Sequence, residues 1–252
     1  MTDSLGYRMK FGVIAPSTNT SVQPEFDEMR PAGVTNHFAR IRIPDMKVAS
    51  DRDFNNLVKV IERNQYDAVD SVMTCSPGYL IMGMSAETFW GGADAAAKLK
   101  VRMEKRAGVG VTMGSEACEM ALATYSRHYA RIRRIAVITP YMPVGDRNVV
   151  RFFTDIGYEV VAVKGLKCRS PMLIAHTSRE TLRDAIVELN TSEVQAIVQV
   201  GTNLAMAHLA PAAEIMIKKP VIAINTAIYW HALRKNRIKD RVRGFGTLLE
   251  RH

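Results

Sequence analysis

A cysteine stands where the sequence predicts the end of a buried strand. Residues 66–74 form an apolar run that predicts a strand, Cys75 follows it directly, and Ser76, Pro77 and Gly78 predict a turn. Active sites of α/β proteins lie outside the carboxyl ends of strands, where nearby N–H groups lower the pKa of a thiol. We therefore predict a reactive Cys75 with Ser76 beside it, and the alternative is an inert core cysteine.

A second stretch repeats this strand-and-turn design in the other half of the chain. Residues 196–200 predict a strand, and Gly201, Thr202 and Asn203 follow it. Glycine stands here where the first stretch has sulfur. The two stretches together predict one pocket with two walls, of which only the wall of Cys75 carries a thiol.

Two further turns carry polar side chains after predicted strands. Ser17 and Asn19 follow residues 11–16, and hydroxyl and amide donors near a helix start suit a carboxylate, although a simple capped turn is the alternative. Tyr141 follows residues 135–139. Its phenol could bind an anion or move a proton, and the alternative is an aromatic ring packed in the core with its hydroxyl in water.

Strands that alternate with helices must position these side chains. The predicted strands cover residues 11–16, 34–43, 66–74, 108–112, 135–139, 158–163, 196–200 and 220–224. The predicted helices cover residues 51–64, 86–107, 115–129, 144–156, 178–189, 209–217 and the segment from 226. This alternation predicts an α/β fold with mainly parallel sheets in two similar lobes. We expect residues 1–114 plus 226–252 in the first lobe, with Cys75, and residues 115–225 in the second, with Tyr141 and Gly201.

Composition narrows the class of protein. The 252 residues are 47% hydrophobic and 23% charged, without an apolar run of membrane-spanning length or an apolar signal core, which predicts a cytoplasmic protein that binds no membrane. The net charge of +9 comes from short dispersed clusters, which favour small anions over nucleic acid. Three cysteines without paired spacing, and histidines and glycines outside ligand or nucleotide motifs, predict neither a metal nor a cofactor.

Three stretches together resemble a known superfamily. Residues 12–20 (GVIAPSTNT), 74–76 (TCS) and 139–142 (TPYM) look like the aspartate/glutamate racemase superfamily, in the branch of maleate cis/trans isomerases and arylmalonate decarboxylases. The resemblance spans nearly the whole chain. It implies two Rossmann-like lobes related by a pseudo-twofold axis, a site in the cleft between them, no cofactor, a small dicarboxylate as substrate, and compatibility with a homodimer.

The resemblance also implies roles for individual residues. Cys75 matches the nucleophile of the isomerases, and Asn19 and Tyr141 match residues that hold carboxylates. A second cysteine of the isomerases falls on Gly201, next to Thr202. A further asparagine falls near Pro171, in the loop of residues 169–174, which is apolar and suited to enclose a hydrophobic substituent.

One thiol suffices for either of two reactions. In maleate-type isomerisation, a Cys75 thiolate adds to the double bond, the single bond rotates and elimination follows, with Tyr141 or Thr202 assisting protonation. In arylmalonate-type decarboxylation, Cys75 protonates an enediolate that Ser76, Thr202 and Tyr141 hold. We expect the isomerase-like reaction, with the decarboxylase as the alternative. Gly201 argues against a racemase with two opposed thiols, and a non-catalytic anion-binding module stays open.

Overall fold

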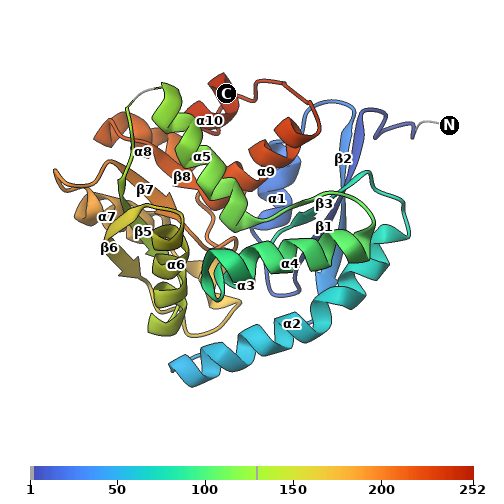
Figure 1. The fold of residues 1–252 in the computed structure, drawn as a ribbon, viewed down its shortest axis with the longest axis horizontal. Helices are drawn as coiled ribbons and strands as arrows, with labels where there is room; N and C mark the ends of the chain where they lie inside the picture. Colours follow the sequence, from blue (N-terminus) through green and yellow to red (C-terminus); the bar gives the residue numbers. More distant parts are fainter. Residues whose placement is uncertain (1–2, 129) are drawn as a thin grey trace.

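The computed structural model describes residues 3–128 and 130–252. These residues contain two parallel sheets of four strands each, surrounded by helices (Figure 1). The first has the order β2-β1-β3-β4 and the second the order β6-β5-β7-β8, with all pairs parallel. The second order repeats the first with every number raised by four. The predicted α/β fold with two similar lobes is therefore confirmed. The strands are β1 (Met9–Pro16), β2 (Val34–Ile41), β3 (Tyr79–Met82), β4 (Val111–Thr112), β5 (Arg134–Thr139), β6 (Glu159–Gly165), β7 (Ala196–Gln199) and β8 (Val221–Ala223).

Helices connect and cover these strands. They are α1 (Val22–Glu28), α2 (Asp51–Met73), α3 (Ala86–Phe89), α4 (Gly92–Ala107), α5 (Gly114–His128), α6 (Pro143–Asp155), α7 (Arg179–Leu189), α8 (Leu209–Ile217), α9 (Ile224–Lys235) and α10 (Thr247–Arg251), with a 3-10 turn at Leu173–His176. The helix predicted over residues 86–107 is two helices, because Gly91 and Gly92 have φ angles of 78° and 84°. The helix predicted over residues 115–129 is α5, and Tyr129 lies outside the described residues.

The strand predicted over residues 66–74 is wrong, because these residues form the last turns of α2. The buried side chains of this helix continue one stripe along its whole length: Phe54, Leu57, Val58, Ile61, Gln65, Ala68, Val69 and Val72. Spacings of three and four residues mark one helix face. The strand that follows is the short run Tyr79–Met82, in which every residue is buried.

Helix α2 bridges the two lobes along one side of the molecule (Figure 1). Its Asp51 carboxylate accepts a hydrogen bond from the N–H of Val144 at the start of α6, at 2.8 Å, and pairs with Arg147 at 2.8 Å. The ring of Phe54 lies 5.1 Å from that of Tyr141. The first half of α2 therefore packs on the second lobe, and its second half covers the first sheet.

The segment after residue 223 returns to the first lobe. On α9, Tyr229 is fully buried, its ring lies 5.0 Å from Phe26 and 5.9 Å from Phe11, and its hydroxyl donates to Asn36 at 3.1 Å. This packing agrees with a first lobe that takes up the C-terminal segment, although the lobe boundaries proposed from the sequence stay a prediction. Within the described residues, no helix has the length and apolar character needed to cross a membrane.

Candidate active site

A pocket opens where strands from both sheets end. Its floor contains Pro16 at the end of β1, Met84 after β3, Pro140 after β5 and Gly201 after β7, and its empty volume is about 500 Å³ including the mouth. Turns at the carboxyl ends of parallel strands are the usual place for a ligand site in this class of fold. The two lobes therefore face each other across one pocket, as the repeated strand-and-turn design predicts.

One side of the pocket is apolar. Helix α2 contributes Phe54, Leu57, Val58 and Ile61, and Ile43 precedes it in the chain. Pro171 and Ile174 of the loop over residues 169–174 complete this side, and the enclosure of a hydrophobic substituent by this loop stays a prediction.

Cys75 lies near the amino-terminal ends of β1 and β3, at the opposite end of the first sheet from the pocket, so its predicted place in the pocket is wrong. It follows the last turn of α2 and precedes β3, and its carbonyl accepts a hydrogen bond from Lys10 Nζ at 2.8 Å. Lys10 begins β1, whereas Pro16 ends it in the pocket. The seven steps between the eight residues of β1, at about 3.3 Å each, separate its two ends by roughly 23 Å. The half-buried Cys75 thiol donates instead to the carbonyl of Val72 at 3.2 Å, because the helix continues through the residues read as a strand.

Two other predicted residues lie outside the pocket lining. Ser76 shares the turn of Cys75, with a φ angle of 51° and an N–H bonded to the carbonyl of Met73. Ser17 lies beside the pocket, but its hydroxyl donates to the carbonyl of Ile43 at 3.1 Å and it is exposed. Cys118 is fully buried in α5 and lies outside the pocket lining, and this burial raises the pKa of its thiol.

The structure brings the remaining predicted residues together: Asn19, Tyr141, Gly201, Thr202 and Asn203 all line the pocket. Asn19 Oδ1 accepts from the N–H groups of Ser21 and Val22 at the start of α1, both at 3.0 Å, and its Nδ2 donates to Thr202 Oγ1 at 3.1 Å. The capped turn considered as the alternative therefore exists, and the same asparagine also joins the two walls.

A pair of hydroxyls forms the polar centre of the pocket. Tyr141 Oη and Ser85 Oγ lie 2.6 Å apart, and Ser85 Oγ accepts a hydrogen bond from the N–H of Thr202 at 3.2 Å. The pair has two hydroxyl protons, and its mutual hydrogen bond uses one of them. One proton is therefore left to donate to a ligand, whichever hydroxyl carries it. Burial raises the pKa of Tyr141, so the phenol stays neutral and acts as a donor.

Ser85 and Glu87 are pocket residues that the sequence reasoning missed. They follow the strand β3, whose four apolar residues after Pro77 and Gly78 were the overlooked signal. Ser85 precedes α3, and Glu87 lies within it. Glu87 is only 3% exposed, and this burial raises the pKa of its carboxyl to about 7.

The pocket has little charge of its own. Among the described residues that line it, Glu87 is the one carboxylic acid, and lysine, arginine, histidine and cysteine are not represented. Within the same described chain, no cluster of histidine, cysteine, aspartate and glutamate could hold a metal ion. An anion in this pocket would be held by neutral hydroxyl and N–H donors.

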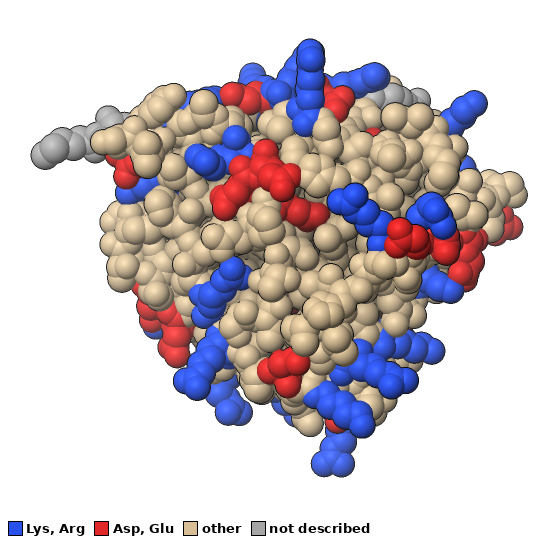
Figure 2. Space-filling model, turned by 180° about the vertical axis from the view of Figure 1, so that it is seen from behind, with Lys and Arg blue, Asp and Glu red and all other residues tan. Residues whose placement is uncertain are grey.

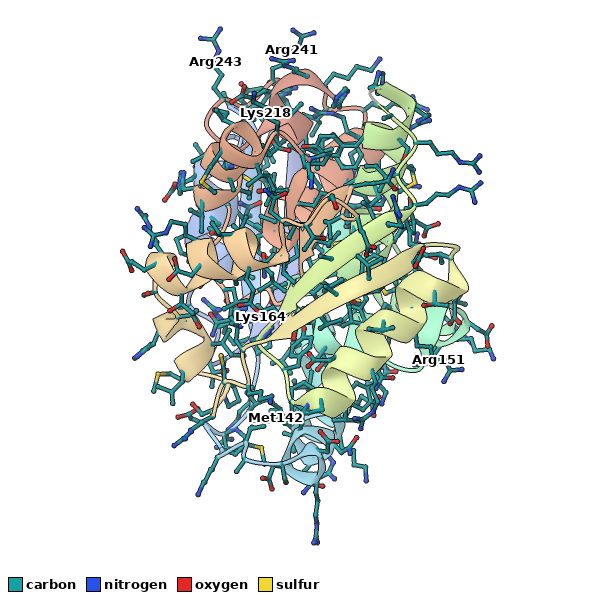
Figure 3. All side chains as sticks on the ribbon, turned by 90° about the vertical axis from the view of Figure 1, so that its left-hand side faces the viewer. Met142, Arg151, Lys164, Lys218, Arg241 and Arg243 are labelled. Atoms are coloured by element: carbon teal, nitrogen blue, oxygen red, sulfur yellow. The ribbon has the colours of Figure 1, made fainter. Side chains whose placement is uncertain are left out.

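Basic side chains lie elsewhere on the molecule. On the face shown in Figure 2, lysines and arginines are interspersed with acidic groups. Figure 3 shows Arg241 and Arg243 extending into solvent at the opposite end of the molecule from Met142, which directly follows Tyr141 of the pocket. Arg241 and Arg243 therefore do not supply charge to the pocket.

Known proteins with similar sequence and fold include isomerases and decarboxylases. The sequence profile described as arylmalonate decarboxylase matches residues 11–249. A maleate isomerase of Pseudomonas putida is 21% identical over 253 aligned residues, covering 95% of this chain and 96% of the relative. A maleate cis-trans isomerase of Nocardia farcinica, in a variant with a covalently bound succinylcysteine intermediate, superposes with a TM-score of 0.85 at 20% identity, over 97% of this chain and 99% of the other. A crystal structure of arylmalonate decarboxylase superposes with a TM-score of 0.73 at 19% identity, over 95% and 98%.

Proposed function

Because this chain belongs to the arylmalonate decarboxylase family, we propose that it is an enzyme that decarboxylates a small malonate-type dicarboxylic acid with an apolar substituent, without a cofactor. The observation that carries this proposal is the pocket itself. Three hydroxyl groups, on Ser85, Tyr141 and Thr202, meet an apolar wall at the ends of β3, β5 and β7, and no cysteine is among the described residues that line it.

The hydroxyl side suits the carboxylate that remains on the product. Loss of CO₂ from a malonate leaves an electron pair at the α-carbon, which spreads onto the remaining carboxylate as an enediolate. The free hydroxyl proton of the Ser85–Tyr141 pair is a donor for this developing charge. A preorganised donor of this kind lowers the barrier by about 3 kcal/mol.

The apolar side suits the departing carboxylate and the substituent. A charged carboxylate is poorly solvated beside Leu57, Val58 and Ile61, whereas neutral CO₂ is not penalised there. The same side chains favour an aryl or alkyl group on the α-carbon by burying its surface. Substrate binding on the hydroxyl side and charge loss on the apolar side together favour decarboxylation.

The isomerase reaction expected from the sequence lacks its nucleophile in this pocket. Addition to a maleate double bond requires a nucleophile such as a thiolate, and Cys75 lies at the opposite end of the first sheet from the pocket. The likeness to maleate isomerases nevertheless makes maleate the second compound to test.

The test is to incubate the purified protein, after treatment with a chelator, with phenylmalonate, methylmalonate and maleate. We expect CO₂ and phenylacetate from phenylmalonate, slower turnover of methylmalonate because its substituent buries less surface, and no fumarate from maleate. Tyr141→Phe should lower turnover, whereas Tyr66→Phe, on the far part of α2, should not. Fumarate without CO₂ would overturn the decarboxylase proposal in favour of isomerisation, and neither product would overturn both.

A further inference from the structure

Glu87 carries a buried carboxyl group whose Oε1 atom has no bonding partner within the described protein. It lines the pocket, it is 3% exposed, and its Oε1 atom is buried without a hydrogen-bond partner. A buried polar atom left unpaired costs about 1–3 kcal/mol. Such a group in a pocket is therefore a candidate for a role toward a ligand.

The surroundings of Glu87 favour its protonated form. Burial is the main cause of its raised pKa of about 7, and the Glu62 carboxylate on α2 adds to it. The hydroxyl of Tyr141 is neutral, and a negative charge on Glu87, on Asp146 of α6 or on Cys118 of α5 would raise its pKa further. Cations are not among the groups that shift the Glu87 carboxyl.

We propose that Glu87 is the general acid of this pocket, in place of a thiol, and that it delivers a proton to the α-carbon of a bound carboxylic acid. The inference rests on the proposed decarboxylation for its substrate class. It rests on geometry for the residue, because Glu87 is the one carboxyl among the described lining residues and its free oxygen has no other partner.

Loss of CO₂ and protonation by Glu87 are two successive steps. The bond from the α-carbon to the leaving carboxylate breaks, CO₂ departs, and its electron pair stays on the remaining part as an enediolate held by Ser85 and Tyr141. The O–H bond of Glu87 then breaks as a C–H bond forms at the α-carbon, which leaves a Glu87 carboxylate. A proton from water restores the acid, so the sum is dicarboxylate plus one proton giving monocarboxylate plus CO₂.

The same group acts in reverse on a monocarboxylic acid. An ionised Glu87 can remove the α-proton of phenylacetate, whose enediolate the hydroxyl pair stabilises, and can return a deuteron from D₂O. This exchange needs no decarboxylation. It therefore tests Glu87 separately from the proposed overall reaction.

The experiment compares wild type, Glu87→Gln and Glu119→Gln. Glu119 is a partly buried glutamate with a raised pKa that lies outside the pocket lining, so it is the matched control. Exchange of the α-protons of phenylacetate is followed by NMR in D₂O, CO₂ release from phenylmalonate is followed in parallel, and binding of phenylacetate is measured by calorimetry.

We expect Glu87→Gln to lower both rates at least 100-fold with binding changed less than fivefold, and Glu119→Gln to match wild type. The wild-type rate of CO₂ release should fall as the pH rises above about 7, where Glu87 loses its proton, and this limb should be absent from the residual activity of Glu87→Gln. Glu87→Asp should recover part of the rate.

The two proposals fail in different ways. Wild-type rates of CO₂ release and exchange in Glu87→Gln would overturn the role of Glu87 and leave the decarboxylase standing. Exchange that depends on Glu87, without CO₂ release from any malonate, would support Glu87 and overturn the decarboxylase. Neither reaction in wild type would overturn both.

Discussion

Tyr141 combines a ligand-facing hydroxyl with a ring that holds the pocket wall. The ring packs against Phe54 and the hydroxyl bonds to Ser85. Tyr141→Phe keeps the first contact and removes the second. We expect it to lower kcat/KM for phenylmalonate about 100-fold, as for loss of one donor to an oxyanion, and the free energy of unfolding by only about 1 kcal/mol. Steady-state kinetics and urea unfolding measure the two effects. An unfolding loss as large as the activation loss would mean that the hydroxyl is structural.

Cys75 provides a prediction of no effect. Its thiol donates a hydrogen bond to the carbonyl of Val72, at the end of the first sheet opposite the pocket. We expect Cys75→Ala to keep wild-type kcat and KM, and iodoacetamide to alkylate this half-buried thiol without inhibition. Mass spectrometry locates the label, and the rate of CO₂ release reports activity. Inhibition that follows the labelling of Cys75 would contradict the placement of the pocket.

Glu87 makes the folded protein less stable as the pH rises. Its folded-state pKa, about 7, lies above the unfolded value of 4.5, so folded protein binds the proton more tightly. The contribution of this proton to the free energy of unfolding is therefore fully present below about pH 4.5, and it is lost as the pH rises to about 7. Glu87→Gln removes the titration. At pH 8 the variant should be more stable than wild type by about 3 kcal/mol relative to the difference at pH 4.5, measured by urea unfolding. An equal difference at both pH values would contradict the burial argument.

Helix α2 decides which substituent the pocket accepts. Leu57 faces the pocket from this helix, whereas Leu99 on α4 is buried to the same extent, at 5% against 6% exposure, away from the pocket. Either Leu→Ala change should lower the free energy of unfolding by about 2–5 kcal/mol.

Only Leu57→Ala should also change specificity, because only it enlarges the pocket. We expect kcat/KM for naphthylmalonate relative to phenylmalonate to rise about 10-fold, as a contact change of this size allows. Competition between the two substrates measures the ratio directly. An equal ratio in Leu57→Ala and Leu99→Ala would mean that α2 does not contact the substituent.

The same helix shows what the sequence can predict. Strand-and-helix alternation predicted both sheets, and turns after β1, β5 and β7 brought Asn19, Tyr141 and Thr202 into the pocket. The prediction is wrong between residues 66 and 82. Residues 66–74 are a nine-residue run with two aspartates that continues the buried face of α2, and the strand that follows is only four residues long. Short apolar runs do not distinguish strand from helix by period alone.

Burial of an acid is the other property that the sequence could not predict. Glu87 belongs to a four-residue helix, and the sequence around it does not differ from that around a solvent-exposed glutamate. Its burial arises from packing of α3 against the neighbouring helix α4 and against helices α2, α5 and α6, which are more distant in sequence. A functional role for such a residue becomes visible only once the tertiary structure places it.

Asn203 connects the two lobes across the pocket. Its Oδ1 accepts from the N–H of Thr20 at 2.9 Å, and its Nδ2 donates to the carbonyls of Thr18 at 3.3 Å and Pro171 at 3.0 Å. Both Nδ2 protons and one acceptor site of Oδ1 are therefore already bonded to the protein. Its expected part in substrate binding is therefore indirect, through the width of the cleft and the position of the loop that carries Pro171.

Asn203→Ala tests this cross-lobe tie. Loss of three hydrogen bonds of about 1 kcal/mol each should lower the free energy of unfolding by about 3 kcal/mol. The KM for phenylmalonate should rise roughly 10-fold with a smaller change in kcat, because a wider cleft weakens substrate binding before it affects proton transfer. Asn236→Ala is the control, since its amide bonds to Ala232 within α9 and joins no lobes. If both variants lose the same stability and keep the same KM, the lobes hold their spacing by apolar packing alone, and Asn203 has no part in setting the pocket.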